Sequence, residues 1–151
     1  LPVQSSEIHA SKKKEFNELK KKKDYGAIEK DEEAFQKFLK NFVMQTLRRG
    51  TYRWPFGHMA GKRAESGERG FKICESCKGT FRSKDVEKDH VEPVIPVTGF
   101  KSWDETIARM FVKSTGYQIL CIQCHDNKTK IENQMRIFHG QKPLRAKKRK
   151  K

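Results

Sequence analysis

Two closely spaced cysteine pairs constrain the fold of this chain more than any other feature. Two residues separate Cys74 from Cys77 and Cys121 from Cys124, and the 151-residue sequence contains no other cysteine. Two such pairs together can supply the four sulfur ligands of one tetrahedral zinc ion. We therefore predict a structural zinc site formed by all four thiolates. Two disulfides are the alternative, which we disfavour because a bridge within each pair would add little constraint to the chain.

The chain between the two pairs is 43 residues long, which exceeds the roughly 15–20 residues of a simple zinc ribbon. We expect a further folded unit inside this loop. A short strand is predicted to end near Asp89 and His90, because valines flank this pair and prolines follow at Pro93 and Pro96. Neighbouring residues of a regular strand point to opposite faces. Asp89 and His90 can share one site only if the strand departs from regular pleating, and we expect that it does.

Three further elements are predicted after this pair. Ser102 and Glu105 have the spacing of a capping box, which indicates the start of a short helix. A second strand is predicted over residues 117–121, and a second helix from Cys124 toward Gly140. The inward positions are expected to be Trp103, Ile107, Met110 and Phe111 around the first helix, and Ile131, Met135 and Phe138 in the second.

An amphipathic helix is predicted before the cysteine pairs. Asp31 is a suitable N-cap and Gly50 a suitable terminating residue. Apolar residues recur between them at intervals of three and four, so they lie on one helical face. We interpret this face as packing on the core; binding to a membrane or to a partner helix is the alternative. The apolar positions are Phe35, Phe38, Leu39, Phe42, Val43 and Leu47.

The segment of residues 51–70 mixes aromatic and basic side chains with glycines. Arg53, Trp54, Lys62 and Arg63 are candidates for nucleic-acid binding, because aromatic rings stack on bases while cations contact phosphates. The alternative is an ordinary connecting loop in which Trp54 is buried.

The charge of the chain favours a polyanionic partner. The sequence has 34 Lys and Arg against 19 Asp and Glu, which gives a formal charge of +15. Residues 142–151 contribute seven cations and no acid, while residues 1–30 contribute eight cations and five acids. We predict a basic flexible arm over residues 1–30 and a basic tail over residues 142–151, each either attracted to phosphates or simply solvated. Residues 31–70 then contain a helix and an aromatic and basic connecting segment, and residues 71–141 form the main folded domain.

The sequence shows no apolar run of the kind that spans a bilayer and no apolar block typical of a secretory signal. We therefore expect no membrane partner and an intracellular location. The oligomeric state is left open.

The order of these motifs resembles the HNH endonuclease family, in its subset with four zinc-binding cysteines. The resemblance rests on the first cysteine pair, then Asp89-His90-Val91-Glu92-Pro93, then residues 119–125 with Lys128-Thr129. Residues 52–55, 97–100, 103–105 and 116–118 are more narrowly similar to HNH proteins of tailed bacteriophages, which would place the protein in the cytoplasm of a bacterial host. The resemblance covers residues 52–133.

This resemblance implies an α+β fold of the ββα-metal type and a metal-dependent DNA endonuclease. His90 would be the general base, and Asp89 and His125 would hold one Mg²⁺ or another divalent ion. Asp126 or Asn127 is the alternative to His125. Lys128 is placed to contact phosphate or to balance charge near this site, and a solvated helix face is the alternative.

The central Asn of the family is missing, because Gly116 and Tyr117 stand at its positions. Another group must therefore anchor that loop. Two other functions stay open. One is a zinc-dependent nucleic-acid-binding module that has lost catalysis, and the other is a zinc protein directed at RNA.

Deleting residues 142–151 should weaken the salt dependence of DNA binding. Each phosphate contact releases counterions from the DNA when the protein binds. With fewer contacts fewer counterions are released, so the logarithm of affinity should fall less steeply with the logarithm of salt concentration. Fluorescence anisotropy over a salt series measures this slope. An unchanged slope would show that the tail does not contact the duplex.

Overall fold

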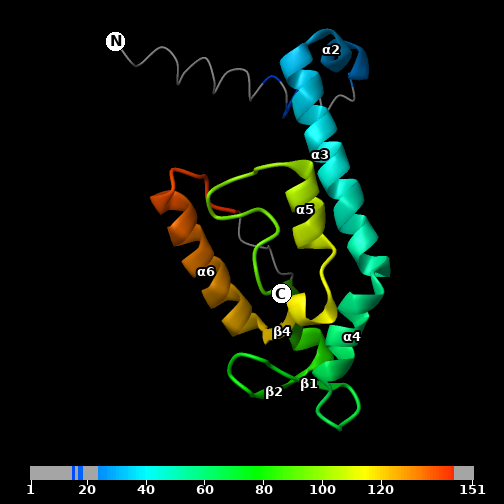
Figure 1. The fold of residues 1–151 in the computed structure, drawn as a ribbon, viewed down its shortest axis with the longest axis vertical. Helices are drawn as coiled ribbons and strands as arrows, with labels where there is room; N and C mark the ends of the chain where they lie inside the picture. Colours follow the sequence, from blue (N-terminus) through cyan, green and yellow to red (C-terminus); the bar gives the residue numbers. More distant parts are fainter. Residues whose placement is uncertain (1–14, 16, 19–23, 145–151) are drawn as a thin grey trace. The chain divides into compact units, whose positions relative to one another are not determined.

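The computed structural model describes residues 15, 17, 18 and 24–144, which have a mixed α+β fold (Figure 1). The chain forms two units, Leu1–Thr46 and Leu47–Lys151. Most of the predicted arm of residues 1–30, and the tail from residue 145 onward, lie outside the described residues.

Over residues 24–46 of the first unit, the structure shows two helices. Helix α2 spans Tyr25–Lys30 and helix α3 begins at Glu32, continuing to Gly50 in the second unit. Asp24 and Asp31 cap them, and Asp31 Oδ1 accepts from the amides of residues 33 and 34 at 3.0 and 3.2 Å. The predicted N-cap at Asp31 is thereby confirmed. Residues 25–30, at the end of the predicted arm, are helical: Asp24 caps the helix, and Ile28 is buried together with Ala34 of α3.

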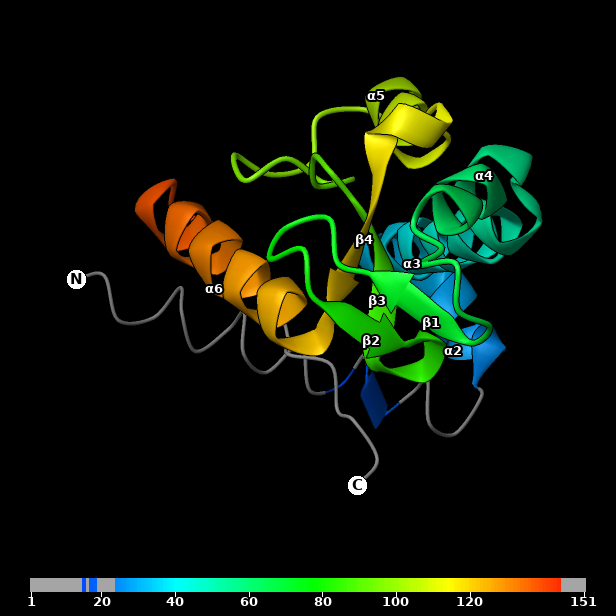
Figure 2. The same ribbon diagram turned by 90° about the horizontal axis from the view of Figure 1, so that it is seen from below.

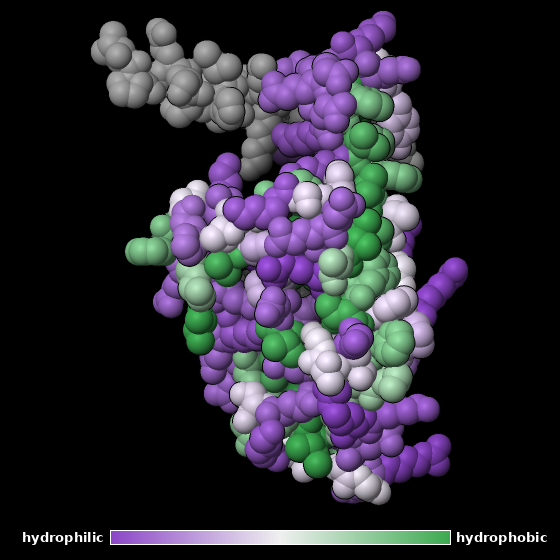
Figure 3. Space-filling model, viewed as in Figure 1, coloured by the Kyte–Doolittle hydropathy of each residue, from purple (hydrophilic) through white to green (hydrophobic). Residues whose placement is uncertain are grey.

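The apolar face of α3 is only partly covered. Phe38 packs against the buried pair Ile28 and Ala34, whereas Phe35, Leu39 and Phe42 are exposed. Hydrophobic residues accordingly form a band along α3 in Figure 3. No helix in the described part of the chain combines the length and the apolar composition that crossing a membrane requires.

The second unit continues with a short 3₁₀ turn, η1 (Thr51–Arg53), and helix α4 (Pro55–Arg63). Residues 51–70 were predicted as a connecting segment, with no helix assigned to them. Pro55 occupies the first helical position of α4, where its fixed φ favours a helix and its missing N–H costs nothing. Trp54 lies inside the unit. Its Nε1 donates to the carbonyl of Val112 at 2.7 Å, and its ring contacts the rings of Phe56 and Phe111.

Two antiparallel hairpins follow. Strands β1 (Phe71–Ile73) and β2 (Thr80–Arg82) form the first, and η2 (Ser83–Asp85) leads from β2 into the second. Strand β3 (Val86–His90) pairs with β4 (Tyr117–Cys121) residue by residue from Val86 with Cys121 to His90 with Tyr117. Both of these strands were predicted from the sequence.

Helices lie on both sides of the β3–β4 ribbon. Helix α6 (Ile122–Phe138) contacts one side and α4 contacts the other, as Figure 2 shows. Helix α5 (Trp103–Met110) and the 3₁₀ turn η3 (Ser114–Gly116) connect β3 to β4. The Ser102 hydroxyl accepts from the Glu105 amide at 3.2 Å, which confirms the predicted helix start. The Glu105 carboxylate instead pairs with Arg109.

The predicted inward face of α6 is wrong. Ile131, Met135 and Phe138 are 58%, 47% and 86% exposed. The buried side chain of this half of α6 is Arg136, 2% exposed, which donates to the carbonyls of Ile95 and Pro96 at 2.6 and 3.0 Å. The helix therefore holds the long β3–α5 connection through a guanidinium. Around α5, Met110 is buried as predicted, but Ile107 is exposed.

Candidate functional site

The four cysteines converge on one point. Their sulfur atoms all lie within 4.8 Å of one another, and all four thiols are free. Cys77 Sγ and Cys121 Sγ are 4.0 Å apart, about twice the length of a disulfide bond. A tetrahedral ion with Zn–S bonds of about 2.3 Å separates its sulfurs by about 3.8 Å. The cluster therefore has the dimensions of a four-thiolate metal site.

Local backbone geometry presents the first pair. The Lys78 amide donates to the Cys74 carbonyl and the Cys74 amide to the Gly79 carbonyl, both at 2.9 Å. Lys78 adopts a left-handed φ of 62°. A Cβ on Gly79 would lie 2.9 Å from the Phe81 ring, so this tight turn requires glycine at its end.

The second pair lies where β4 becomes α6. Cys121 is the last residue of β4 and the N-cap of α6, and its sulfur accepts from the Cys124 amide at 3.5 Å. The Cys121 amide donates to Cys74 Sγ at 3.3 Å, which joins the two pairs directly.

The thiols differ in acidity. Burial alone would raise the pKa of Cys74, but hydrogen bonds from the amides of Cys121, Cys77 and Ser76 lower it to about 6. Burial raises the pKa of Cys121 to about 11. At neutral pH the metal-free cluster therefore contains both thiolate and thiol, and Cys121 must lose its proton to bind a metal.

His90 lies at the end of β3 with one ring nitrogen fixed. Its Nε2 lies 2.9 Å from the carbonyl of Met110, and the Tyr117 hydroxyl donates to the same oxygen at 2.9 Å. A carbonyl can only accept, so Nε2 carries the proton and Nδ1 of the neutral ring keeps its lone pair. Within the described residues Nδ1 forms no hydrogen bond, and it is not among the buried unpaired atoms. Water can reach it.

Asp89 contacts a different element. Its Oδ2 lies 2.9 Å from Lys128 Nζ of α6 and 3.4 Å from Gln118 Nε2 of β4. The pairing of β3 with β4 is uninterrupted through His90. The expected departure from regular pleating is therefore wrong. Asp89 is directed toward α6, whereas His90 is directed toward the end of α5.

His125 lies in the first turns of α6, close to carboxylates. Its Nε2 is 3.7 Å from Glu87 Oε2 and its Nδ1 is 3.7 Å from Asp126 Oδ1. Its Nδ1 is buried without a hydrogen-bond partner. The sequence analysis missed Glu87, although it precedes Asp89 by two residues and therefore shares its face of β3. Asn127, the other alternative ligand, is exposed.

The positions of the missing Asn have a structural role of their own. Tyr117 is 1% exposed and holds Met110 through its hydroxyl, while the Gly116 carbonyl accepts from the Val91 amide at 2.9 Å. A Cβ on Gly116 would lie 2.5 Å from Val112. These two residues thus supply the anchor that the sequence analysis required.

The basic candidates divide into paired and exposed cations. Arg63 bonds to Glu75 at 2.9 Å and to the carbonyls of Ser114 and Tyr117, which ties α4 to the hairpin. Burial lowers the pKa of Lys128, but its hydrogen bonds to Glu132 and Asp89 raise it above its usual range. Arg53 and Lys62 are exposed.

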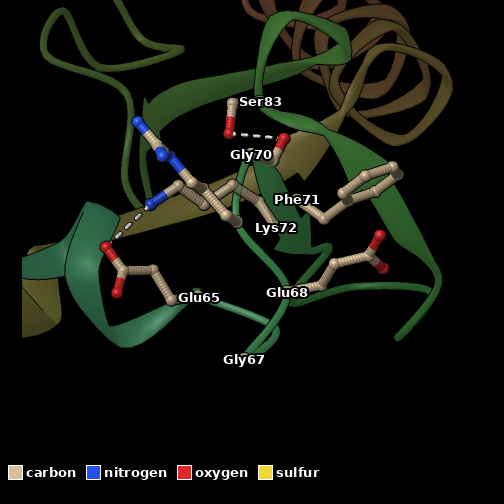
Figure 4. Close-up of a pocket in the computed structure, with 8 residues that line it drawn as sticks. Glu65, Gly67, Glu68, Gly70, Phe71, Lys72 and Ser83 are labelled. Atoms are coloured by element: carbon tan, nitrogen blue, oxygen red, sulfur yellow. Dashed lines mark hydrogen bonds and ion pairs between the residues drawn. The ribbon is translucent and has the colours of Figure 1, made fainter.

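Two surface hollows lie near these elements. A groove of about 390 Å³ between β4 and α6 is lined by residues that include Gln118, Asn127 and Lys128. A second hollow, of about 440 Å³, lies beside β1 (Figure 4). Its Lys72 is paired with Glu65 and its Ser83 donates to the Gly70 carbonyl, so its polar groups satisfy one another.

The chain matches no protein-family model, no curated protein and no solved structure. Its chemistry must therefore be argued from its own geometry. In the described residues the four cysteines are the one group of three or more His, Cys, Asp or Glu with converging ligand atoms.

We expect the chain to bind one zinc or cobalt ion in a four-thiolate site, with affinity that rises with pH because Cys121 must deprotonate. Replacing Cys121 with Ser should remove this ion and lower the melting temperature, since structural zinc supplies folding free energy on the order of 10 kcal/mol. Metal analysis, cobalt–thiolate absorption and thermal melting measure these effects. Ser76→Ala, in the turn between Cys74 and Cys77, is the control; an unchanged metal content in Cys121→Ser would contradict the site.

Proposed function

We propose that this protein is a metal-dependent DNA endonuclease of the ββα-metal type, held together by a four-cysteine zinc site. The observation that carries the proposal is the state of His90. Its Nε2 is fixed by the Met110 carbonyl, while its Nδ1 lone pair is open to water at the end of a strand. That arrangement is what a general base needs.

The proposed reaction is hydrolysis of a phosphodiester. A water molecule attacks phosphorus and gives its proton to His90 Nδ1, and the bond from phosphorus to the 3′ oxygen breaks. The leaving oxygen takes a proton from solvent. The Met110 carbonyl stabilises the protonated imidazole through Nε2, and the Tyr117 hydroxyl on the same carbonyl fixes that carbonyl in place.

The residues that would hold a catalytic divalent ion are His125 and the carboxylates on the same side of β3. His125 Nε2 lies 3.7 Å from Glu87 Oε2, and Glu87 and Asp89 supply oxygen ligands of the kind that Mg²⁺ prefers. In the described residues the ligand atoms of these three side chains do not converge as the cysteine sulfurs do, so binding an ion would require them to move together. Such an ion would act as a Lewis acid on the phosphate and stabilise the leaving oxygen. Lys128 neutralises Asp89 and would have to release it for ligation.

Charge supports DNA as the substrate. The formal charge of +15 attracts polyphosphates, and this attraction does not depend on sequence. Exposed Arg53 and Lys62 are the candidates for phosphate contacts in the described unit. Trp54 is not a candidate for base stacking in this arrangement, because its ring packs on Phe56 and Phe111.

A second function, a zinc-dependent nucleic-acid-binding module without catalysis, is favoured by one observation. Asp89 and His90 are directed toward different elements, and Asp89 already has a cationic partner. Incubating supercoiled plasmid with the full chain and Mg²⁺, Mn²⁺ or EDTA distinguishes the two, because only the nuclease converts the plasmid to nicked or linear DNA.

Replacing His90 with Ala should lower the rate of metal-dependent plasmid cleavage by about 10²–10⁴-fold, the usual contribution of a general base. Duplex binding should change little, because the variant retains every cation. His139→Ala is the matched control, since His139 is an exposed histidine at the far end of α6. Wild-type cleavage by His90→Ala would eliminate the assigned base.

Replacing His125 with Ala, or Glu87 with Gln, should raise the Mg²⁺ concentration needed for half-maximal cleavage. Each change removes a ligand from the proposed ion and leaves the zinc cysteines in place. Titration of metal against cleavage rate gives the shift, and zinc content verifies that the fold is retained. If only Asp89→Asn shifts the curve, His125 and Glu87 are not ligands.

A further inference from the structure

Lys88 is a cation near His90 that has no role in the proposed reaction. It lies at the centre of β3, two residues before His90, so the two side chains share one face of the strand. Its Nζ lies 5.3 Å from the centre of the Tyr117 ring, and the His90 ring lies 4.6 Å from the same ring. Lys88 forms no ion pair and no hydrogen bond with any residue in the described part of the chain.

Helix α4 makes room for this amine. Gly57 is buried in the first turn of α4, and a Cβ there would lie 2.5 Å from Lys88 Nζ and 3.4 Å from its Cε. Glycine inside a helix costs about 1 kcal/mol relative to alanine. An alanine at this position would displace the flexible end of the Lys88 side chain. A Cβ on Gly61, one turn later in the same helix, would meet no atom within 4 Å.

The surroundings of Lys88 lack the group that a lysine normally meets. The carboxylates of β3, Glu87 and Asp89, are on the other face, directed toward α6. The Tyr117 ring attracts the ammonium weakly, by about 0.5–1 kcal/mol at an exposed position. An anion beside Nζ would provide the missing hydrogen-bond acceptor and counter-charge.

We infer that Lys88 forms a phosphate-binding site on the α4 side of β3, which holds a phosphodiester of the nucleic acid next to His90. The inference rests on the proposed function for its substrate. The site consists of the Lys88 ammonium, which lies against Gly57, and the imidazole on the same face of β3. It places a positive charge on the same face of β3 as the proposed base, whereas the proposed divalent ion is held from the opposite face.

Two variants of the full chain test this site in different ways. Lys88→Met keeps the apolar stem and removes the charge, while Gly57→Ala keeps the charge and displaces the amine. Each should lower the plasmid cleavage rate by about tenfold, the value of one charge-assisted hydrogen bond. Lys88→Met should also lower the salt slope of duplex binding by about 0.9, the value of one phosphate contact.

The double variant and the controls make the test specific. Because both changes remove the same contact, Lys88→Met combined with Gly57→Ala should be no slower than the slower single variant. Gly61→Ala controls for a new methyl group in α4, and Lys84→Met controls for loss of one exposed cation. Melting curves and zinc content verify that each variant is folded.

The outcomes separate this inference from the proposed function. If the wild type cleaves DNA while folded Lys88→Met retains its rate and salt slope, Lys88 has only a structural contact with Tyr117, and the inference fails alone. If the wild type binds duplex without cleaving it, the nuclease proposal fails, and a lower slope in Lys88→Met still supports the phosphate site. A wild type that neither binds nor cleaves DNA overturns both.

Discussion

The convergence of four cysteine sulfurs is the constraint on which the second unit depends. It joins the turn after β1 to the point where β4 becomes α6, across 43 intervening residues. The hydrophobic core around it is small, consisting of Cys74, Leu120 and Cys121 with Phe81 and Cys124 packed against them. A core of this size supplies little stability by itself. A metal ion bound by the four sulfurs would supply the stability that apolar burial supplies in larger domains, and it would fix where α6 starts relative to the β3–β4 hairpin.

A single carbonyl determines the chemistry at the other end of that hairpin. The Met110 oxygen accepts from both His90 and Tyr117, which are paired across the strands. The Met110 carbonyl thus fixes the tautomer of the His90 imidazole. Through the Tyr117 hydroxyl it also ties the end of α5 to the start of β4. Tyr117, buried in the core, thereby anchors the end of the β3–α5–β4 connection.

Local signals in the sequence were sufficient for helices α3, α5 and α6, for strands β3 and β4 and for the cysteine cluster, but not for α2, α4, β1 or β2. Asp31 and Ser102 mark helix starts through short-range hydrogen bonds, and the cysteine spacing determines which sulfurs converge. Features that depend on distant contacts were not predictable. The exposure of Phe138 and the burial of Arg136 follow from which part of α6 meets the hairpin, and the inward position of Trp54 follows from a bond to Val112, 58 residues away. Pro55 favours the start of a helix, and this signal was present in the sequence, but the glycine-containing stretch around it was predicted as a connecting segment.

Successive side chains of β3 point to opposite faces of the strand, and this determines where the proposed metal ligands and the proposed base can meet the substrate. Glu87 and Asp89 are directed toward α6, while Lys88 and His90 are directed toward α4 and α5. A phosphodiester cannot pass through the strand, so a phosphate that meets both groups must lie at the end of β3, where Asp89 and His90 are the last residues. The ribbon consists of two strands, and β4 covers only one edge of β3. Metal ligands and base would then reach the phosphate from the two sides of that strand end, which lets adjacent residues of a regular strand perform opposite tasks.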